Sequence, residues 1–248
     1  MKKIILVTGA SRGIGASVAQ LAGTRGYRVI VNYLKDKKSA DAVVQYIKNS
    51  GGEAIAMQAD VGDLSAVKEM FVKIDELWGM VDVLVNNAGM LANFRVEDVT
   101  DAEISQIFRI NVFSTYFCSS EAIKRMSTKH GGKGGAIINL SSVAARLGGL
   151  GGGSGYAATK GAISTFTLAL AKEVGHEGIR VNAVSPGLIE TEIHNIHGGV
   201  QQMQELAKTA VPMGRHGSAD EVAEAILWLA SDAASYVDGT VVDVAGGR

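Results

Sequence analysis

A glycine-rich loop near the start of the chain most constrains the fold. Residues 4–7 form an apolar run of the kind that is buried in a parallel sheet. The run leads directly into Thr8-Gly9-Ala10-Ser11-Arg12-Gly13-Ile14-Gly15, and apolar residues at helical spacing follow. Glycines there permit a tight turn, and the amides of the next helix N-terminus can receive an anion. The segment therefore predicts a βαβ unit with a pyrophosphate-binding loop, although its spacing is Gly-x-x-x-Gly-x-Gly rather than Gly-x-Gly-x-x-Gly.

The alternation of strand and helix patterns along the chain predicts a single α/β domain over residues 1–248. No Pro-rich linker and no internal repeat divides the sequence, which contains two prolines. Helices are expected at 63–78, 102–126, 156–174 and 219–230. After the first strand, further strands are expected at 28–33, 53–59, 81–85, 136–140, 179–184 and 240–244.

Composition excludes several classes of protein. The formal net charge is −1 and no run of one sign occurs, so neither nucleic acid nor an anionic membrane is expected as a partner. The apolar run after Lys2-Lys3 is too short for a secretion signal, and no segment has the length of a membrane span. The single Cys118 excludes a disulfide within the chain and suits a reducing compartment, so a cytoplasmic location is expected. No metal is predicted, because His194 and His197 lack a third ligand at suitable spacing.

The second strand indicates which dinucleotide is bound. An NAD site usually has a carboxylate near the end of this strand for the ribose 2′-hydroxyl, whereas here Tyr33 holds that position and no acid occurs from 28 to 35. Arg12 and Lys35 instead offer positive charge for a 2′-phosphate. NADP(H) is therefore favoured. NAD(H) stays open, because the lysines could be a solvated face and Asp36 could turn back.

Tyr156 and Lys160 form the main candidate catalytic pair. They lie one turn apart on the same face of an expected helix, where the ammonium would favour the phenolate and lower the pKa of Tyr156. Ser142 lies upstream, after the 136–140 strand, and its hydroxyl could orient a carbonyl or hydroxyl group. A tyrosine and a lysine at this spacing are common in helices, so the assignment as a catalytic pair depends on the motifs in the rest of the chain.

Other segments are expected to border the same site. Asn86-Asn87-Ala88-Gly89 and Ser185-Pro186-Gly187 follow two strands, at the sheet edge where open α/β folds bind ligands, although they could be ordinary turns. The segment 188–203 is polar and irregular and is expected to form a substrate lid extending to about residue 215. The helix at 102–126 is apolar on more than one face, which leaves surface for a partner subunit, and Asn111 is its polar exception.

In this order and spacing, these residues resemble the classical short-chain dehydrogenase/reductase family over essentially the full length of the chain. The subgroup most similar is glucose-1-dehydrogenase-like or 3-oxoacyl-carrier-protein reductase-like. The resemblance implies a Rossmann fold with a seven-stranded parallel sheet, strand order 3-2-1-4-5-6-7, and helices on both faces. It also implies a homotetramer or homodimer that pairs the helices at 102–126 and 156–174. The matching positions are Thr8, Gly9, Gly13, Gly15, Asn86, Asn87, Ala88, Gly89, Asn111, Ser142, Tyr156, Lys160, Pro186, Gly187 and Thr191.

The resemblance also implies a role for each catalytic residue. Tyr156 would be the proton donor in reduction and the base in oxidation, and Ser142 would position the substrate oxygen. Lys160 would lower the pKa of Tyr156 and hold the nicotinamide ribose, and Asn111 would hold a water that links Lys160 to solvent. Asp60 and Val61 would contact the adenine, and Thr191 the carboxamide. The full set of expected cofactor contacts is Gly9, Ser11, Arg12, Gly13, Ile14, Gly15, Tyr33, Lys35, Asp60, Val61, Asn87, Ala88, Gly89, Tyr156, Lys160, Pro186, Gly187, Ile189 and Thr191.

Two departures from the family pattern accompany this interpretation. Ser142 and Tyr156 are 14 residues apart, one more than usual, which leaves Ser141 as an alternative. The position that is acidic in NAD-dependent members is occupied by Tyr33.

The expected function is NADP(H)-dependent hydride transfer to or from a carbonyl or secondary alcohol, with a sugar or a 3-oxoacyl thioester as candidate substrates. The alternative is a nicotinamide-binding regulator without turnover.

Overall fold

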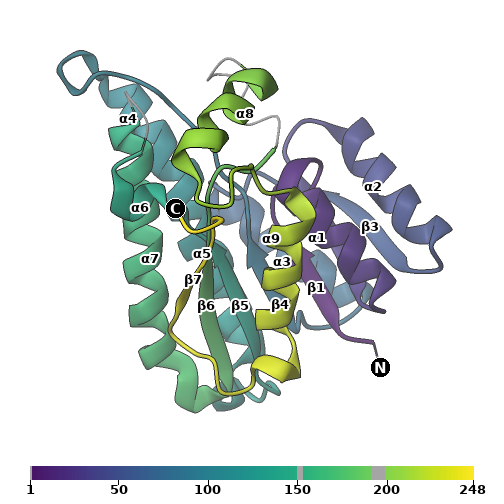
Figure 1. Cartoon of the computed structure of the whole chain (residues 1–248). Coiled ribbons are helices and arrows are strands. Elements are labelled where there is room, and N and C mark those ends of the chain that lie inside the picture. The colour runs from purple at the N-terminus through teal and green to yellow at the C-terminus, as the bar shows by residue number, and fades with distance from the viewer. Residues whose placement is uncertain (1, 150–152, 191–198) are drawn as a thin grey trace.

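Seven parallel strands form one sheet in the order β3-β2-β1-β4-β5-β6-β7, at the centre of a Rossmann-like domain (Figure 1). The computed structural model describes residues 2–149, 153–190 and 199–248, and for residues 199–203 it describes only the backbone. Both the strand order and the parallel pairing confirm the prediction from sequence. The strands are β1 (Ile4–Val7), β2 (Arg28–Tyr33), β3 (Glu53–Gln58), β4 (Val83–Asn86), β5 (Gly135–Leu140), β6 (Ile179–Pro186) and β7 (Val241–Val244).

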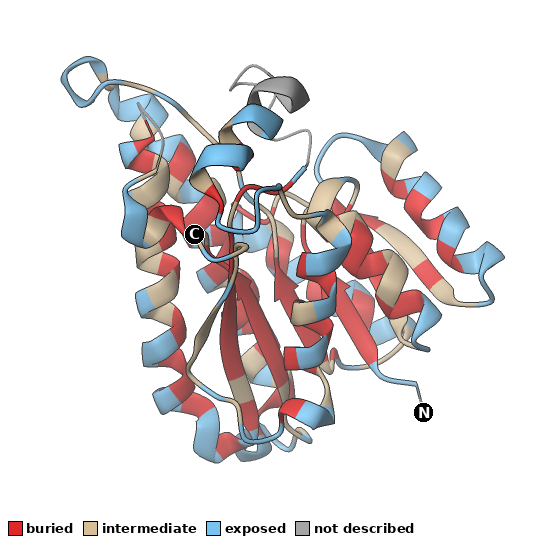
Figure 2. Ribbon diagram, in the orientation of Figure 1, coloured by how far each residue is buried: buried red, intermediate tan, exposed pale blue. Residues whose placement is uncertain are grey.

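Helices cover both faces of the sheet, so the strands are buried on both sides (Figure 2). One layer contains α1 (Gly13–Thr24), α2 (Lys37–Asn49) and α9 (Ala219–Ala230), and the other contains α3 (Leu64–Leu77), α5 (Ser114–Met126) and α7 (Ser154–Val174). Alternate residues of a strand point to opposite layers, which explains why the strands read as continuous apolar runs. The remaining helical elements are η1 (Val96–Asp98), α4 (Asp101–Phe108), η2 (Arg109–Phe113), η3 (Thr128–His130), α6 (Ala144–Leu147), η4 (Gly175–Glu177), α8 (Gly199–Ala210) and η6 (Asp232–Ala234).

The long helix expected over 102–126 is interrupted by a wider turn. It comprises α4, the π-helical turn η2 and α5, which follow one another without a break. A π-turn adds one residue to a helical turn and often occurs at functional sites. Asn111 lies within η2 and is buried. The buried amide of Asn111 thus coincides with the geometric irregularity of this helix, and α5 buries further polar residues, among them Ser119 and Glu121.

The expectation of an irregular segment over 188–203 needs a correction. From Gly199 onward the chain is helical, as α8, whereas residues 191–198, with His194 and His197, lie outside the described residues. The expected segment ends at 203, before the apolar residues of this helix. Leu206 and Ala207 of α8, with Val211 just after it, pack against Leu188.

The glycine loop between β1 and α1 closes tightly over the sheet edge. Gly9 and Gly13 have φ angles of 61° and 56°, in the left-handed region that favours glycine. Gly15, in the first turn of α1, lies under the Asn87 side chain. A Cβ added at Gly15 would lie 2.4 Å from Nδ2 of Asn87 and 2.7 Å from the carbonyl oxygen of Gly9.

The loop therefore predicts different outcomes for two Gly→Ala substitutions in helices. Gly15→Ala should lower the free energy of unfolding by about 1–3 kcal/mol, because the added methyl group would clash with the carbonyl oxygen of Gly9 and with the hydrogen-bonded side chain of Asn87. Gly161→Ala on α7 is the control. No atom lies within 4 Å of its added Cβ, and alanine favours the helix by about 1 kcal/mol. Urea denaturation of both variants checks this, and equal stability of Gly15→Ala and the wild type would contradict it.

Candidate active site

A cavity of about 470 Å³ lies at the carboxyl ends of β1 to β4. Its position is the one where open α/β sheets bind ligands. Gly15 does not line it, since it is buried beneath Asn87, and Thr191 lies outside the described residues. The cavity brings together twelve of the expected cofactor residues, namely Gly9, Ser11, Arg12, Gly13, Ile14, Tyr33, Lys35, Asp60, Val61, Asn87, Ala88 and Gly89.

Thr8 and Asn87 hold the glycine loop against the end of β4. The Thr8 hydroxyl donates to the Val85 carbonyl (3.3 Å) and accepts from the amides of Asn87 and Ala88, both at 3.0 Å. The side-chain amide of Asn87 donates to the carbonyls of Thr8 (2.8 Å) and Gly9 (3.0 Å). Asn87 thus shapes the cavity by bracing the loop, a role that the sequence reasoning did not assign.

Asn32 braces the loop from the other side and was missed from sequence. Its Oδ1 accepts from the amide of Gly9 (3.1 Å), and its Nδ2 donates to the carbonyls of Met57 (3.3 Å) and Ala59 (3.2 Å). Asn32 is 1% exposed, in a strand of otherwise mostly apolar residues. An amide in such a strand is the signal that could have identified it, because a buried polar group needs partners.

Asp36 lines the cavity beside Lys35, and its carboxylate caps a helix. It accepts from the backbone amide of Ser39 (3.0 Å) at the start of α2. This bond, with smaller contributions from the charges of Arg12 and Lys38, holds the pKa of Asp36 below its usual value. The cap of α2 therefore engages one oxygen of the acid that follows the end of β2.

Asp60, expected at the adenine, is held in place by two contacts. Its carboxylate accepts from the amide of Gly62 (2.9 Å) and pairs with the Arg109 guanidinium (2.9 Å), which reaches it from the start of the π-turn. Arg109 therefore links the π-turn to the cofactor cavity, which the sequence did not reveal.

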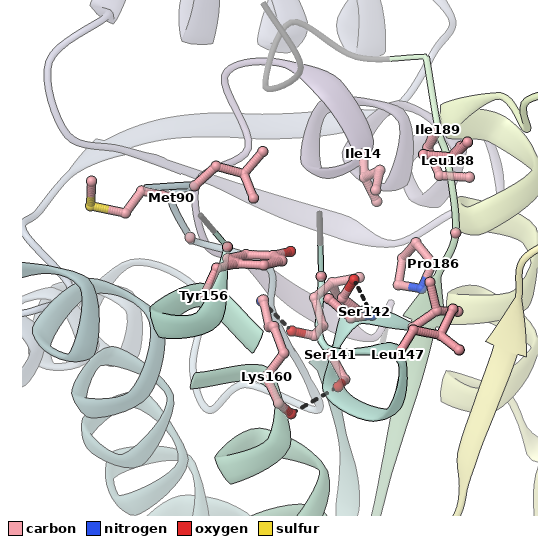
Figure 3. Close-up of a pocket in the computed structure, with 18 of the residues that line it drawn as sticks. Ile14, Met90, Ser141, Ser142, Leu147, Tyr156, Lys160, Pro186, Leu188 and Ile189 are labelled. Atoms are coloured by element: carbon pink, nitrogen blue, oxygen red, sulfur yellow. Dashed lines mark hydrogen bonds between the residues drawn. The ribbon is translucent and has the colours of Figure 1, made fainter. Parts of the chain in front are cut away.

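A second pocket, of about 150 Å³, adjoins the cavity and shares Ile14, Asn87, Gly89 and Met90 with it. Figure 3 shows Tyr156 and Ser142 facing each other across this pocket, with Lys160 beneath the tyrosine ring. Besides the shared residues, the predicted site residues that line this pocket are Ser142, Tyr156, Lys160, Pro186, Gly187 and Ile189. Asn111, predicted with them, does not line it.

Tyr156 does not show the lowered pKa that the sequence predicted. Burial raises its pKa to about 12, and a hydrogen bond with Ser142 acts in the opposite direction without offsetting it. Desolvation favours the neutral phenol. In the chain without a cofactor, burial therefore determines the direction of the Tyr156 pKa shift, and the Lys160 charge does not reverse it.

Lys160 is buried and held by the end of β5. Its ammonium donates to the carbonyl of Leu140 (2.6 Å), and its Nζ lies 5.7 Å from the centroid of the Tyr156 ring. Burial lowers the pKa of Lys160 to about 8. Lys160 thus adjoins Tyr156 as predicted, but its charge is itself weakened by the same desolvation.

The two adjacent serines have different surroundings. The hydroxyl of Ser141 is 3.0 Å from the Lys160 carbonyl and 2.7 Å from the hydroxyl of Ser164, so it ties β5 to α7. Ser142 lines the pocket and bonds Tyr156, and its Oγ also accepts from the amide of Ala144 (3.2 Å). The geometry favours Ser142 over Ser141 at the reacting group.

Asn111 holds the segment that separates the two cavities. Its Oδ1 accepts from the amide of Met90 (2.7 Å), and its Nδ2 donates to the Met90 carbonyl and the Thr159 hydroxyl, both at 3.0 Å. The Thr159 hydroxyl in turn donates to the carbonyl of Tyr156 (2.7 Å). Asn111 therefore connects the loop after β4 to the helix that carries Tyr156 and Lys160.

Comparisons with known proteins agree with this geometry. The family model described as Enoyl-(Acyl carrier protein) reductase matches residues 9–248. The chain is 48% identical to an uncharacterized oxidoreductase, YgfF, of Escherichia coli K12 over 99% of both chains. It is 38% identical to the 3-oxoacyl-[acyl-carrier-protein] reductase FabG of Staphylococcus aureus, over 100% of this chain and 98% of the relative.

A solved structure is similar along the same length. A short-chain dehydrogenase from Burkholderia cenocepacia J2315, in complex with NADP, has a TM-score of 0.89 and 34% identity, over 99% of this chain and 97% of that chain.

The burial of Lys160 predicts that its removal stabilises the protein. The fall of its pKa from 10.5 to about 8 corresponds to about 3 kcal/mol against the charged form, and the lost bond to Leu140 offsets about 1 kcal/mol. Lys160→Met should therefore raise the free energy of unfolding by about 2 kcal/mol below pH 8, where Lys160 is charged in both states. The gain should disappear as the pH rises towards 10.5, because the wild-type penalty is then lost.

Urea unfolding at pH 7 and pH 10 measures this difference. Lys172→Met, an exposed position on the same helix, is the control and should show no such pH dependence. A Lys160→Met protein that is less stable than the wild type at pH 7 would contradict the prediction.

Proposed function

The chain belongs to the short-chain dehydrogenase/reductase family of oxidoreductases, and we propose that it transfers hydride between NADP(H) and a carbonyl or secondary alcohol. One observation carries this proposal: Ser142, Tyr156 and Lys160 converge in a pocket that adjoins the cavity under the glycine loop. The backbone there approaches closely only because Gly9 and Gly15 lack side chains, which fits a pyrophosphate at the α1 N-terminus. When bound, NADPH supplies the hydride.

Residues of the chain position the substrate, donate the proton and hold the cofactor. The Ser142 hydroxyl holds the carbonyl oxygen, and Tyr156 donates the proton that this oxygen needs as it becomes an alcohol. A tyrosine with a pKa near 12 is protonated at neutral pH, as a proton donor must be. Lys160 holds the nicotinamide ribose, and Asn111 fixes the Met90 segment and a water that connects Lys160 to solvent.

NADP(H) is the proposed cofactor for two reasons. The end of β2 offers Tyr33 and Lys35, and the nearby Asp36 is engaged as a helix cap. The solved Burkholderia relative was obtained with NADP. Asp60 and Val61 would contact the adenine, and the nicotinamide would lie beside Pro186, Gly187, Ile189 and Thr191.

The alternative, a regulator that binds nicotinamide without turnover, has less support. Binding alone does not require Ser142, Tyr156 and Lys160 in one pocket. Relatives are named for reduction, among them the versicolorin reductase stcU of Emericella nidulans, which is 39% identical over 99% of this chain and 95% of the relative. Sugars and 3-oxoacyl thioesters are the substrate classes that the sequence left open.

Assembly and location are part of the same proposal. Phe113, Tyr116 and Leu168 are exposed on η2, α5 and α7, the region expected to pair in a homotetramer or homodimer. Among the helices that the structure describes, none is both long and apolar enough to cross a membrane. We propose a cytoplasmic enzyme with a small-molecule substrate.

Tyr156→Phe tests the proton donor. The kcat of the variant should fall by about 10²–10⁴-fold. Phenylalanine differs from tyrosine only in lacking the phenolic hydroxyl, and general acid catalysis contributes a factor of this size. Its NADPH affinity, followed by nicotinamide fluorescence, should stay within about threefold of the wild type. Tyr46→Phe on the exposed face of α2 is the control, and undiminished turnover by Tyr156→Phe would remove the assigned role.

Cofactor choice is tested at Lys35. The kcat/KM with NADPH should exceed that with NADH, and Lys35→Glu should reduce the ratio by about tenfold, since a carboxylate repels the 2′-phosphate. Lys48→Glu, at the far end of α2, should leave the ratio unchanged. A wild-type ratio below one would refute the preference.

A further inference from the structure

The pocket beside Tyr156 is walled by hydrocarbon side chains from three separate segments. Figure 3 shows Met90 on one side of Tyr156 and Ser142, and Leu147, Leu188 and Ile189 on the other. The three segments follow β4, β5 and β6, so the sheet itself places the apolar groups around one point. They contribute Met90 and Leu91, then Val143 and Leu147, then Leu188 and Ile189.

Among the residues that the structure describes, the polar side chains lining this pocket are few and mostly engaged in hydrogen bonds. The side chains of Asn87, Ser141 and Lys160 are already hydrogen-bonded to other parts of the protein. Ser142 and Tyr156 are needed for the reacting oxygen. The polar side chains among the described lining residues are Asn87, Asn93, Ser141, Ser142, Tyr156, Lys160 and Arg248.

A polyhydroxylated substrate would be poorly matched by such walls. Each hydroxyl that leaves water without gaining a hydrogen bond raises the free energy of the complex. A hydrocarbon group has the opposite effect, because it covers apolar side chains that water now contacts. Leu147 is the clearest case, since it lines the pocket and is 46% exposed.

We propose that the substrate is a ketone flanked by hydrocarbon groups, or the matching secondary alcohol, and not a sugar or other polyol. This inference rests on the proposed function. The carbonyl carbon accepts the hydride of NADPH, which becomes NADP⁺, and the carbonyl oxygen accepts the proton of Tyr156 while it is held by Ser142. The apolar walls select what is attached to that carbon.

Two pairs of ketones of nearly equal shape test the inference. 3-Pentanone and 1,3-dihydroxyacetone differ by exchange of two methyl groups for hydroxyls, and cyclohexanone and tetrahydropyran-4-one by exchange of one methylene for an ether oxygen. With NADPH and the full-length wild-type protein, kcat/KM should favour 3-pentanone at least tenfold over dihydroxyacetone. Cyclohexanone should be favoured about threefold or more over tetrahydropyran-4-one.

A variant of the wall connects this preference to the pocket. Leu147→Asn should lower kcat/KM for 3-pentanone at least fivefold and reduce the ratio within the first pair. Leu77→Asn, at an exposed leucine at the end of α3, is the matched control and should leave both constants unchanged. A ratio that does not change in Leu147→Asn would contradict the assignment of this wall.

The outcomes separate the inference from the proposed function. Tyr156-dependent reduction that prefers dihydroxyacetone, or oxidation of glucose in preference to 3-pentanol, would overturn the inference and leave the function intact. Absence of turnover with every carbonyl would instead contradict the function. In that case, thermal shifts of the NADPH-saturated protein rank the same pairs by binding, and equal shifts for cyclohexanone and tetrahydropyran-4-one would overturn the inference.

Discussion

The burial of Tyr156 and Lys160 against the end of β5 is the constraint on which the site depends. Lys160 reaches the Leu140 carbonyl from α7, and the hydroxyl of Ser141 donates to the backbone carbonyl of Lys160 in return. These contacts fix α7 relative to β5 and so place Tyr156 opposite Ser142. Desolvation then acts on both titratable groups, raising the pKa of one and lowering that of the other.

A second set of buried polar contacts shapes the cofactor cavity. The Asn32 side chain binds the amide of Gly9, the Thr8 hydroxyl binds the amide of Asn87, and the Asn87 side chain binds the carbonyl of Thr8. Together these bonds hold the glycine loop in place. Asn111, in the π-turn η2, does the same for the Met90 segment. Because buried amides need partners, these residues define the cavity walls before any ligand arrives.

Much of this arrangement could be predicted from sequence, because periodicity, glycine placement and motif order are local signals. They predict the strands and bring Ser142, Tyr156 and Lys160 to one site, whereas the strand order came from the family resemblance. Other features depend on contacts across the fold. The packing of Ala207 and Val211 against Leu188 and the contacts of Ser141 with α7 both need tertiary neighbours, whereas the cap that Asp36 forms with Ser39 is local. In the cofactor-free chain the pKa of Tyr156 is raised rather than lowered, because spacing reveals the nearby charge but not the burial.

The ionisation of Tyr156 in the cofactor-free protein tests this account most directly. Phenolate absorbance during a pH titration, with the Tyr156→Phe signal subtracted, isolates this one side chain. Burial predicts no Tyr156 phenolate up to pH 10, where an ordinary tyrosine is half ionised. A Tyr156 phenolate that forms between pH 7 and 9 would contradict the account, because the Lys160 charge would then outweigh desolvation.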